Sequence, residues 1–379
     1  MSRKFLLALG YTALFAPLGT ATILFALHLL DIINAWVFPF YYFTICCIAS
    51  GLSLIAIAPL RSRNQHQTKS GRRMPRRRRL LGIGLVILFL NVNILTFLMS
   101  YYFTHLTTSE QPRLGRPKPI STVTPSERGL SYREYNIPVD NSHWLEVWEI
   151  PAQTSTTKGT ILLFHGNLGT KKQILGAAQS FSTLGFNTIL VDFQGVGGSS
   201  GNTTTVGMRE ARDVVTAFSY IKKRLEGNSG ENAPVILYGF SMGSAAILRA
   251  ISVYGIEPDG IILDLPFVTL SRAIKNRLRY RKMLATPLTE LLIFWASIQH
   301  GLNGFSHNPV IFAKDVNCPT LVIHGKKDKW VSVDEIEVLV QNISAPKILV
   351  KAPKMGHQQL VNANRQLWDS SLQEFLSIL

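Results

Sequence analysis

The chain has 379 residues, 46% of them hydrophobic, and only three cysteines. This length predicts two parts rather than one domain, and so few cysteines exclude a disulfide-based scaffold. The formal net charge of +16 arises mainly in residues 1–103, which hold 11 Lys and Arg and a single acid, Asp31.

Three long apolar segments fill these first residues, at about 5–30, 37–60 and 80–103. Each exceeds the roughly 20 residues that a helix needs to cross a hydrocarbon core of about 30 Å. Each is apolar on all sides, which favours lipid over the core of a soluble domain. A signal peptide is the alternative for the first segment, but its apolar stretch is too long for one. We predict a membrane anchor of three transmembrane helices.

The loop 61–79, between the second and third segments, carries nine positive charges and no acid. Such loops stay on the cytoplasmic side of a membrane, and Arg3 and Lys4 place the N-terminus on the same side. Everything after residue 104 is then extracytoplasmic. The arginines also resemble a nucleic-acid patch. Because they lie between membrane segments, we expect contacts with anionic membrane lipids instead, and no nucleic-acid partner.

Residues 104–133 are polar and contain four prolines. This composition predicts an extended linker that lifts a globular domain, 134–379, off the bilayer. In that domain short apolar runs alternate with helical patterns, which is typical of an α/β fold with a mostly parallel sheet and helices on both faces. Loops after such strands form the ligand crevice. The polar residues in those loops are His165, Asn167, Asp192, Ser241, Asp264, Asp328 and His357.

The sequence Gly-Phe-Ser-Met-Gly at 239–243 lies between an apolar strand and a helix-forming run. In this setting the pattern Gly-x-Ser-x-Gly indicates a nucleophile elbow, which presents Ser241 at the top of the sheet. A serine hydroxyl needs a neighbouring base, and the base needs an orienting group. The chain order in this fold is serine, acid, histidine, so His357, after the last strand, is the expected base.

Two residues are candidates for the orienting acid. We favour Asp328, because the loop after the next strand approaches from the side on which a C-terminal histidine lies. Asp264, which ends the strand after the elbow helix, is the alternative acid; otherwise it braces the elbow loop.

The tetrahedral intermediate of acyl transfer needs preorganised donors for its oxyanion. We expect the backbone N–H groups of Met242 and Asn167 to supply them, with Leu168 as second choice to Asn167. No cofactor is expected. The cysteines and histidines lack metal-ligand spacing, and the glycines at 195–198 have neither a P-loop lysine nor dinucleotide spacing.

These features together resemble an α/β-hydrolase over residues 140–379. The nearest branch is serine-aminopeptidase-like and monoacylglycerol-lipase-like, and it includes membrane-anchored ABHD-type hydrolases. One departure is Gln194, where that branch commonly carries an arginine that braces loops. The resemblance implies acyl transfer by a serine nucleophile. The matching pieces, in chain order, are 164–167, 192–199, 239–243, 264–267, 324–328 and 356–357.

A long insertion at about 268–316 is expected to form a helical lid over Ser241. It begins with six basic residues and continues with an apolar run at 288–295. This composition suits an amphiphilic acyl substrate or the bilayer, and equally an ordinary amphipathic helix. We therefore expect a membrane-anchored serine hydrolase of an ester, thioester or lipid acyl bond. The alternatives are a serine peptidase of the same fold and a non-catalytic, membrane-tethered binding module.

Overall fold

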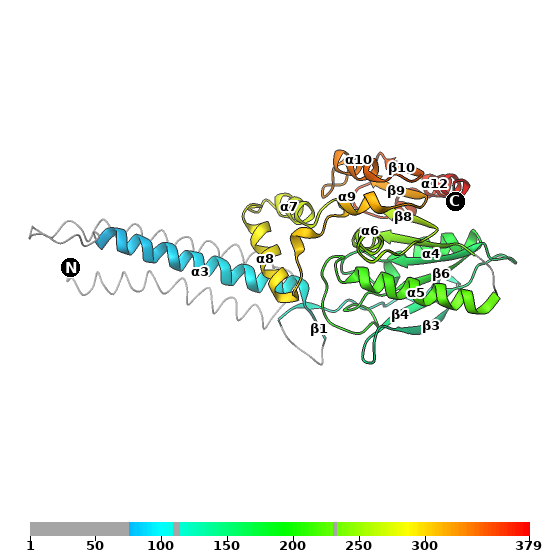
Figure 1. The fold of residues 1–379 in the computed structure, drawn as a ribbon, viewed down its shortest axis with the longest axis horizontal. Coiled ribbons are helices and arrows are strands. Elements are labelled where there is room, and N and C mark those ends of the chain that lie inside the picture. Colours follow the sequence, from blue (N-terminus) through cyan, green and yellow to red (C-terminus); the bar gives the residue numbers. More distant parts are fainter. Residues whose placement is uncertain (1–75, 109–113, 230–232) are drawn as a thin grey trace, which may run out of the picture. The chain divides into compact units, whose positions relative to one another are not determined.

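The computed structural model describes residues 76–108, 114–229 and 233–379 (Figure 1). The chain divides into two units, residues 1–98 and 99–379. The second unit contains both β-sheets and all the described helices except most of α3.

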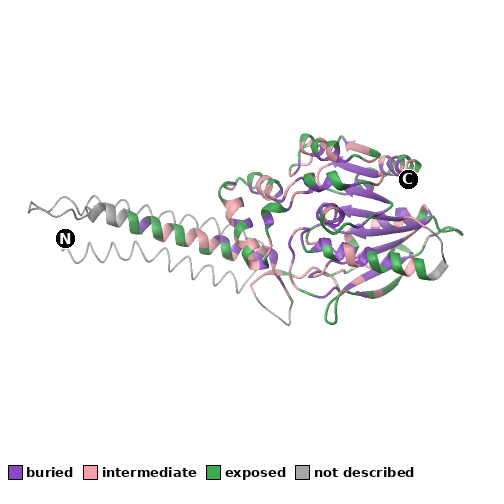
Figure 2. Ribbon diagram, viewed as in Figure 1, coloured by how far each residue is buried: buried purple, intermediate pink, exposed green. Residues whose placement is uncertain are grey.

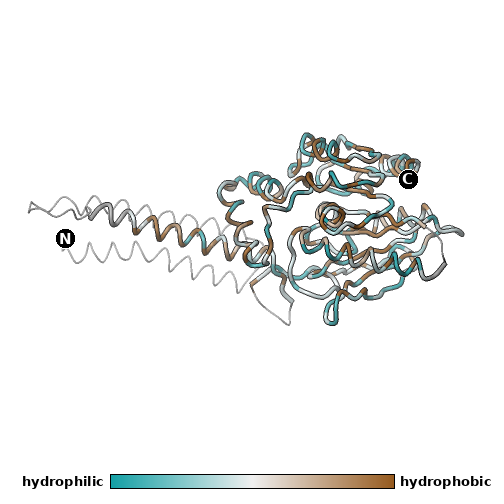
Figure 3. The backbone as a smooth tube through the Cα atoms, viewed as in Figure 1, coloured by the Kyte–Doolittle hydropathy of each residue, from teal (hydrophilic) through white to brown (hydrophobic). Residues whose placement is uncertain are grey.

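The third predicted membrane segment forms most of helix α3 (Arg76–Thr104). Within it Gly82–Thr104 has a mean hydropathy of 2.2, and Figure 3 shows this helix largely in brown. Among the described residues it is the one helix long and apolar enough to cross a membrane, where three were predicted. The other two segments, 5–30 and 37–60, lie outside the described residues, as does most of the basic loop. Their topology stays a prediction.

The second unit is built on an eight-stranded sheet, and β4 runs antiparallel to both of its neighbours. The other pairs are parallel, as predicted, because helical segments return the chain between successive strands. In sheet order the strands are β10 (Lys347–Ala352), β9 (Thr320–Gly325), β8 (Gly260–Asp264), β7 (Val235–Phe240), β5 (Gly159–Phe164), β6 (Phe186–Val191), β4 (Trp144–Ile150) and β3 (Arg133–Pro138).

Alternate residues of each central strand face two separate apolar cores. In β7, Leu237 belongs to the core that also holds residues of α5, α6 and α10, whereas Tyr238 belongs to the core that holds residues of α4 and α12. Figure 2 shows the strands in purple between helices that keep green, exposed faces. The continuous apolar runs of the sequence are therefore explained by burial on both sides of the sheet. The helices are α4 (Leu175–Thr183), α5 (Glu210–Ser229), α6 (Met242–Tyr254), α7 (Leu270–Tyr280), α8 (Leu288–His300), α9 (Pro309–Phe312), α10 (Val333–Asn342), α11 (Leu360–Ala363) and α12 (Arg365–Ser377).

The segment 104–133 differs from the extended linker that its composition predicted. Leu106 is buried in the core beside α5 and α6, and its N–H donates to the carbonyl of Asn202 at 2.7 Å. The side-chain Nζ of Lys118 donates to the carbonyl of Ser199 at 2.7 Å. A short sheet of β1 (Leu106–Thr107) and β2 (Arg116–Pro117) and the 3₁₀ turn η1 (Pro125–Arg128) complete the segment. Its described part is tied to the globular domain, because these hydrogen bonds satisfy polar groups that a free linker leaves to water.

The insertion 268–316 is helical, as predicted, and consists of α7, α8, α9 and the 3₁₀ turns η3 (Gly304–Ser306) and η4 (Ala313–Asp315). Helix α7 begins where the Thr269 hydroxyl accepts the N–H of Arg272 at 3.0 Å. On α8 and the turn that follows it, Phe294, Ile298 and Phe305 line a groove and stay about half exposed.

Gln194, the departure from the family pattern, lies in the loop after β6 and binds Asp213 of α5. Its backbone N–H and its side-chain amide donate to the two carboxylate oxygens at 2.9 and 2.8 Å. Burial raises the pKa of Asp213 to about 7, although these two donors lower it. An arginine here would place a cation against the carboxylate, whereas glutamine leaves the buried acid without one.

This pair predicts a pH-dependent stability. The folded pKa of Asp213, about 7, lies above its ordinary 3.8, so its contribution is full below pH 4 and is lost as pH rises towards 7. Gln194→Arg should lower that pKa, and therefore raise the Tm of the variant relative to wild type by roughly 2–5 °C at pH 8 and by less at pH 5. Thermal unfolding of the detergent-purified chain measures this. Gln373→Arg, exposed on α12, is the matched control. A Tm difference that is flat or falls with pH would contradict the assignment.

Candidate active site

The predicted elbow is a sharp turn between β7 and α6. Ser241 has φ 52° and ψ −104°, which few L-residues adopt, and α6 begins at the next residue. A Cβ on Gly239 would lie 2.4 Å from the Ser244 nitrogen, and one on Gly243 would lie 2.4 Å from the Phe164 carbonyl oxygen. Both flanking positions therefore require glycine.

Ser241, His357 and Asp328 form one chain of hydrogen bonds. Ser241 Oγ lies 2.9 Å from His357 Nε2, and His357 Nδ1 lies 2.6 Å from Asp328 Oδ2. An ionised carboxylate can only accept, so Nδ1 carries the proton and Nε2 is left to accept from the serine. The structure thus brings together the three residues that the sequence nominated, in the protonation pattern that general-base catalysis needs.

Two adjacent loops hold the acid against the histidine. Asp328 follows β9 and His357 follows β10, and the N–H of Lys327 donates to the carbonyl of Met355 at 2.9 Å. A Cβ on Gly325 would lie 2.4 Å from the same carbonyl oxygen, so the loops can approach only because this residue is glycine.

The environment of Asp328 favours its ionised form. Its side chain is fully buried, and burial alone would raise its pKa, but hydrogen bonding and charge from His357 outweigh burial and lower it. The N–H of Trp330 also donates to its second oxygen at 2.8 Å. Asp328 therefore stays charged at neutral pH, as a group that stabilises an imidazolium must.

Asp264, the alternative acid, has a different environment. Its carboxylate accepts the Tyr238 hydroxyl at 2.9 Å, and its backbone carbonyl accepts the N–H of Ser241 at 2.8 Å. Burial raises its pKa to about 7, against hydrogen bonds from Tyr238 and the backbone of Leu360. No hydrogen bond in the described part of the chain joins it to His357. These contacts brace the elbow.

The expected oxyanion donors lie on two segments that pack directly against each other. Met242 begins α6, whose next residue, Gly243, touches the end of β5. Asn167 lies in a turn closed by the N–H of Gly169, which donates to the Gly166 carbonyl at 2.9 Å. Among the described residues, neither the N–H of Met242 nor that of Asn167 donates a hydrogen bond. Both remain available to a ligand beside Ser241.

Comparison with known proteins agrees with this geometry. Residues 155–311 match the family model described as serine aminopeptidase, S33. Protein bem46 of Schizosaccharomyces pombe is 24% identical over 278 residues, covering 72% of this chain and 86% of the relative. Lysophosphatidylserine lipase ABHD12 of Xenopus tropicalis is 27% identical over 207 residues, but this chain spans only 48% of its length. An esterase of Pyrococcus furiosus superposes with a TM-score of 0.56 at 21% identity, covering 69% of this chain and 96% of the esterase. The chain has the α/β-hydrolase fold and is similar to hydrolases of the ABHD type.

The sequence analysis did not identify a buried lysine that follows the turn at 166–169. Lys171 is fully buried at the start of the 3₁₀ turn η2 (Lys171–Ile174), forms ion pairs with Asp192, at 2.7 Å, and with Glu146, and lies 4.8 Å from the Trp148 ring. Its N–H donates to the other oxygen of Asp192 at 2.7 Å. Asp192 is thus explained as the partner of a buried cation. A lysine next to another lysine is normally exposed, so nothing local in the sequence signals this role.

The other nominated loop residue, His165, also has a structural role. Its Nδ1 lies 2.8 Å from the Gly166 carbonyl, and its Nε2 accepts the N–H of Phe193 at 3.1 Å. Burial lowers its pKa, so the ring is neutral and ties the ends of β5 and β6 together.

Two aromatic side chains that the sequence analysis did not nominate, Trp330 and Phe240, flank His357. The Trp330 ring lies 4.5 Å from the His357 ring, and the guanidinium of Arg277 on α7 lies 4.6 Å from the Trp330 ring. Phe240 approaches His357 from β7 at 5.8 Å. Two aromatic rings therefore flank His357, and its side chain is only 11% exposed to water.

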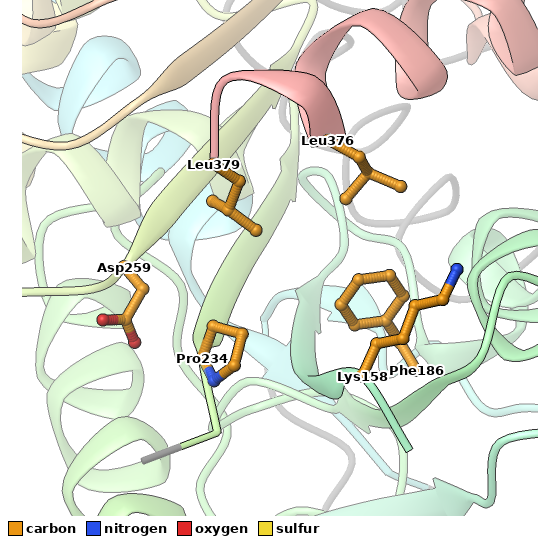
Figure 4. Close-up of a pocket in the computed structure, with 6 residues that line it drawn as sticks. All are labelled: Lys158, Phe186, Pro234, Asp259, Leu376 and Leu379. Carbon is orange, nitrogen blue, oxygen red and sulfur yellow. The ribbon is translucent and has the colours of Figure 1, made fainter. Parts of the chain in front are cut away.

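A hollow at the amino-terminal ends of the strands, opposite to Ser241, contains none of the site residues. Figure 4 shows Pro234 and Asp259 beside it, just before β7 and β8 begin, whereas Ser241 follows the end of β7. In α/β sheets ligands bind at the carboxyl ends of the strands. Within the described part of the chain, no group of three or more His, Cys, Asp or Glu side chains is placed to hold a metal ion.

The close approach at the elbow predicts a sharp difference between two glycines. Gly243→Ala should lower the Tm by roughly 5 °C or more, because its Cβ meets backbone that has no free space. Ester hydrolysis should fall by about 100-fold, because the turn beside Ser241 must shift. Thermal unfolding and turnover of a short-chain ester measure the two effects. Gly227→Ala, at an exposed position of α5 with nothing within 4 Å, should change neither adversely. Full activity in Gly243→Ala would show that the approach is not required.

Proposed function

We propose that this chain is a membrane-anchored serine hydrolase that cleaves an ester, thioester or lipid acyl bond. The observation that carries the proposal is the hydrogen-bond chain from Ser241 through His357 to Asp328, at 2.9 and 2.6 Å, on an elbow with two free N–H donors beside it.

In the first half of the reaction, Ser241 Oγ attacks the substrate carbonyl carbon while His357 Nε2 takes its proton. The ionised Asp328 stabilises the imidazolium that forms. The N–H groups of Met242 and Asn167 donate to the oxyanion, and the N-terminal end of α6 adds its favourable dipole. His357 then gives the proton to the leaving alcohol or thiol, the carbon–oxygen or carbon–sulfur bond breaks, and an acyl-enzyme remains.

In the second half, His357 takes a proton from water and the hydroxide attacks the acyl carbon. The same donors hold the second oxyanion. Collapse breaks the bond to Ser241 Oγ, which recovers its proton from His357, and the free acid leaves.

An acyl ester is favoured over a peptide as the substrate. The insertion beside the site combines basic residues on α7 with half-exposed apolar side chains on α8, which suits an amphiphile. The structural relative is named an esterase and a sequence relative a lysophosphatidylserine lipase. The family description names an aminopeptidase, so a serine peptidase of the same fold is the second candidate.

The predicted membrane anchor supports a hydrolase function at a membrane surface. Helix α3 is long and apolar enough to span a bilayer and ends at Thr104, where the globular domain follows. With the predicted segments 5–30 and 37–60 and the basic loop inside, the domain is extracytoplasmic. Lipid acyl groups are then available to it close to the bilayer.

Covalent labelling tests the nucleophile. The detergent-purified chain should react with a fluorophosphonate probe, because an activated serine is captured as a stable phosphonate. Ser241→Ala should abolish labelling, while Ser370→Ala, at an exposed serine of α12, should keep it. Labelling that survives Ser241→Ala would sink the assignment. A wild-type chain that does not label would favour the non-catalytic binding module.

Two isosteric substitutions separate the two acids. Asp328→Asn should lower kcat on a short-chain ester by about 1,000- to 10,000-fold, because the amide cannot hold the required histidine tautomer. Asp264→Asn should cost at most about tenfold, because its contacts are to Tyr238 and the elbow backbone. Thermal unfolding confirms that each variant is folded. The reverse ranking of the two activities would transfer the orienting role to Asp264.

A further inference from the structure

The peptide between Gly166 and Asn167 carries the second expected oxyanion donor. Its carbonyl accepts two hydrogen bonds, from the N–H of Gly169 at 2.9 Å and from Nδ1 of His165 at 2.8 Å. Nδ1 is the donor, because Nε2 of the same ring accepts the N–H of Phe193. The carbonyl and the N–H of a trans peptide point in opposite directions. The two bonds on this carbonyl therefore direct the N–H of Asn167.

This turn lies directly against the elbow. A Cβ on Gly166 would lie 2.9 Å from Cδ1 of Phe240, the residue before Ser241. A Cβ on Gly243 would lie 3.0 Å from the carbonyl oxygen of His165. The residues that precede the donor N–H therefore pack against the elbow both before and after Ser241.

The turn is strained and needs support from its surroundings. Leu168, its third residue, has a φ of 57°, which is uncommon for a residue with a side chain. Such a conformation persists only where neighbouring groups hold it. The start of η2, directly after the turn, is fixed on two sides. The N–H of Lys171 donates to Asp192 at 2.7 Å, and the hydroxyl of Ser121 donates to that of Thr170 at 2.9 Å.

Gln173 connects η2 to the turn. Its side-chain Oε1 accepts the N–H of Gly166 at 2.7 Å. A Cβ would lie 3.2 Å from the same oxygen if built on Gly166 and 2.2 Å if built on Gly169. The amide oxygen thus fills the space that the two glycines leave inside the turn. Both polar backbone groups of Gly166 are then held, and the next N–H along the chain, that of Asn167, is left free.

Resting on the proposed hydrolase function, we propose that Gln173 positions the N–H of Asn167 for the oxyanion. It acts through Gly166 and takes no part in bond making. A donor stabilises the intermediate only when it points to the place where the negative charge develops. Loss of the amide should therefore weaken binding of the transition state more than binding of the substrate.

Gln173→Met, which keeps the length of the side chain and removes the acceptor, tests this role in the detergent-purified full chain. With para-nitrophenyl butyrate as substrate, kcat should fall by about 10- to 100-fold and KM should stay within about threefold, because the loss falls on the transition state. Gln179→Met makes the same exchange at a partly exposed position of α4 and should change neither constant.

A transition-state analogue separates positioning from general stability. Ser241 Oγ adds to the carbonyl carbon of an octyl trifluoromethyl ketone, the carbonyl electron pair moves to oxygen, and the serine proton goes to His357. Because the adduct carries the oxyanion, its Ki should rise in Gln173→Met by the factor by which kcat/KM falls. Titration with a fluorophosphonate counts the active sites, so that a partly misfolded preparation does not distort kcat.

Gln173→Ala is the second variant, because it leaves room for a water on the N–H of Gly166. It should show the same parallel change of kcat/KM and Ki. An unchanged Ki in both variants would overturn the proposal even if kcat falls, and Gln173 would then only stabilise the fold. A rise in KM without a rise in Ki would also overturn it.

The same assays distinguish this inference from the hydrolase function. A wild-type chain that neither reacts with the fluorophosphonate nor hydrolyses the ester would reject the hydrolase function, and the role of Gln173 with it. Turnover that is lost in Ser241→Ala but is unaffected in both Gln173 variants would retain the hydrolase function and reject only the positioning role.

Discussion

The site depends on how closely the first turn of α6 approaches the end of β5. Gly243 touches backbone there, and Ser241 adopts a φ of 52° that costs on the order of 1–3 kcal/mol. The strain persists because hydrogen bonds hold both sides of the turn. Ser241 donates to the Asp264 carbonyl at 2.8 Å, and the Ser244 hydroxyl donates to the Gly239 carbonyl at 2.6 Å. The same contact that strains the serine places the Met242 N–H next to the loop after β5.

Buried carboxylates of the globular domain differ in pKa according to the groups that surround them. Burial disfavours ionisation of all of them, and it prevails at Asp264 and Asp213, whose pKa values rise to about 7. At Asp328 the histidine and two backbone donors prevail, and the pKa falls. An acid that is half protonated near neutral pH cannot reliably hold an imidazolium. The choice between the two candidate acids therefore has an electrostatic reason as well as a geometric one.

The sequence was informative where short-range patterns decide the structure. Apolar runs predicted the buried strands, and the glycines around Ser241 predicted the turn, because both follow from local sterics and burial. Placing Asp328 and His357 together needed only the order of strands in a known fold. Roles that depend on distant contacts were not accessible. Lys171 looks like a surface lysine until Asp192 and Glu146 enclose it, and the proline-rich segment looks free until Leu106 enters the core.

Aromatic rings on two sides also shape the electrostatics of His357. Trp330 and Phe240 flank His357, so charges near it act through a medium poorer in water, where Coulomb interactions are stronger. The ionised Asp328, whose Oδ2 lies 2.6 Å from His357 Nδ1, therefore acts on this histidine with little screening.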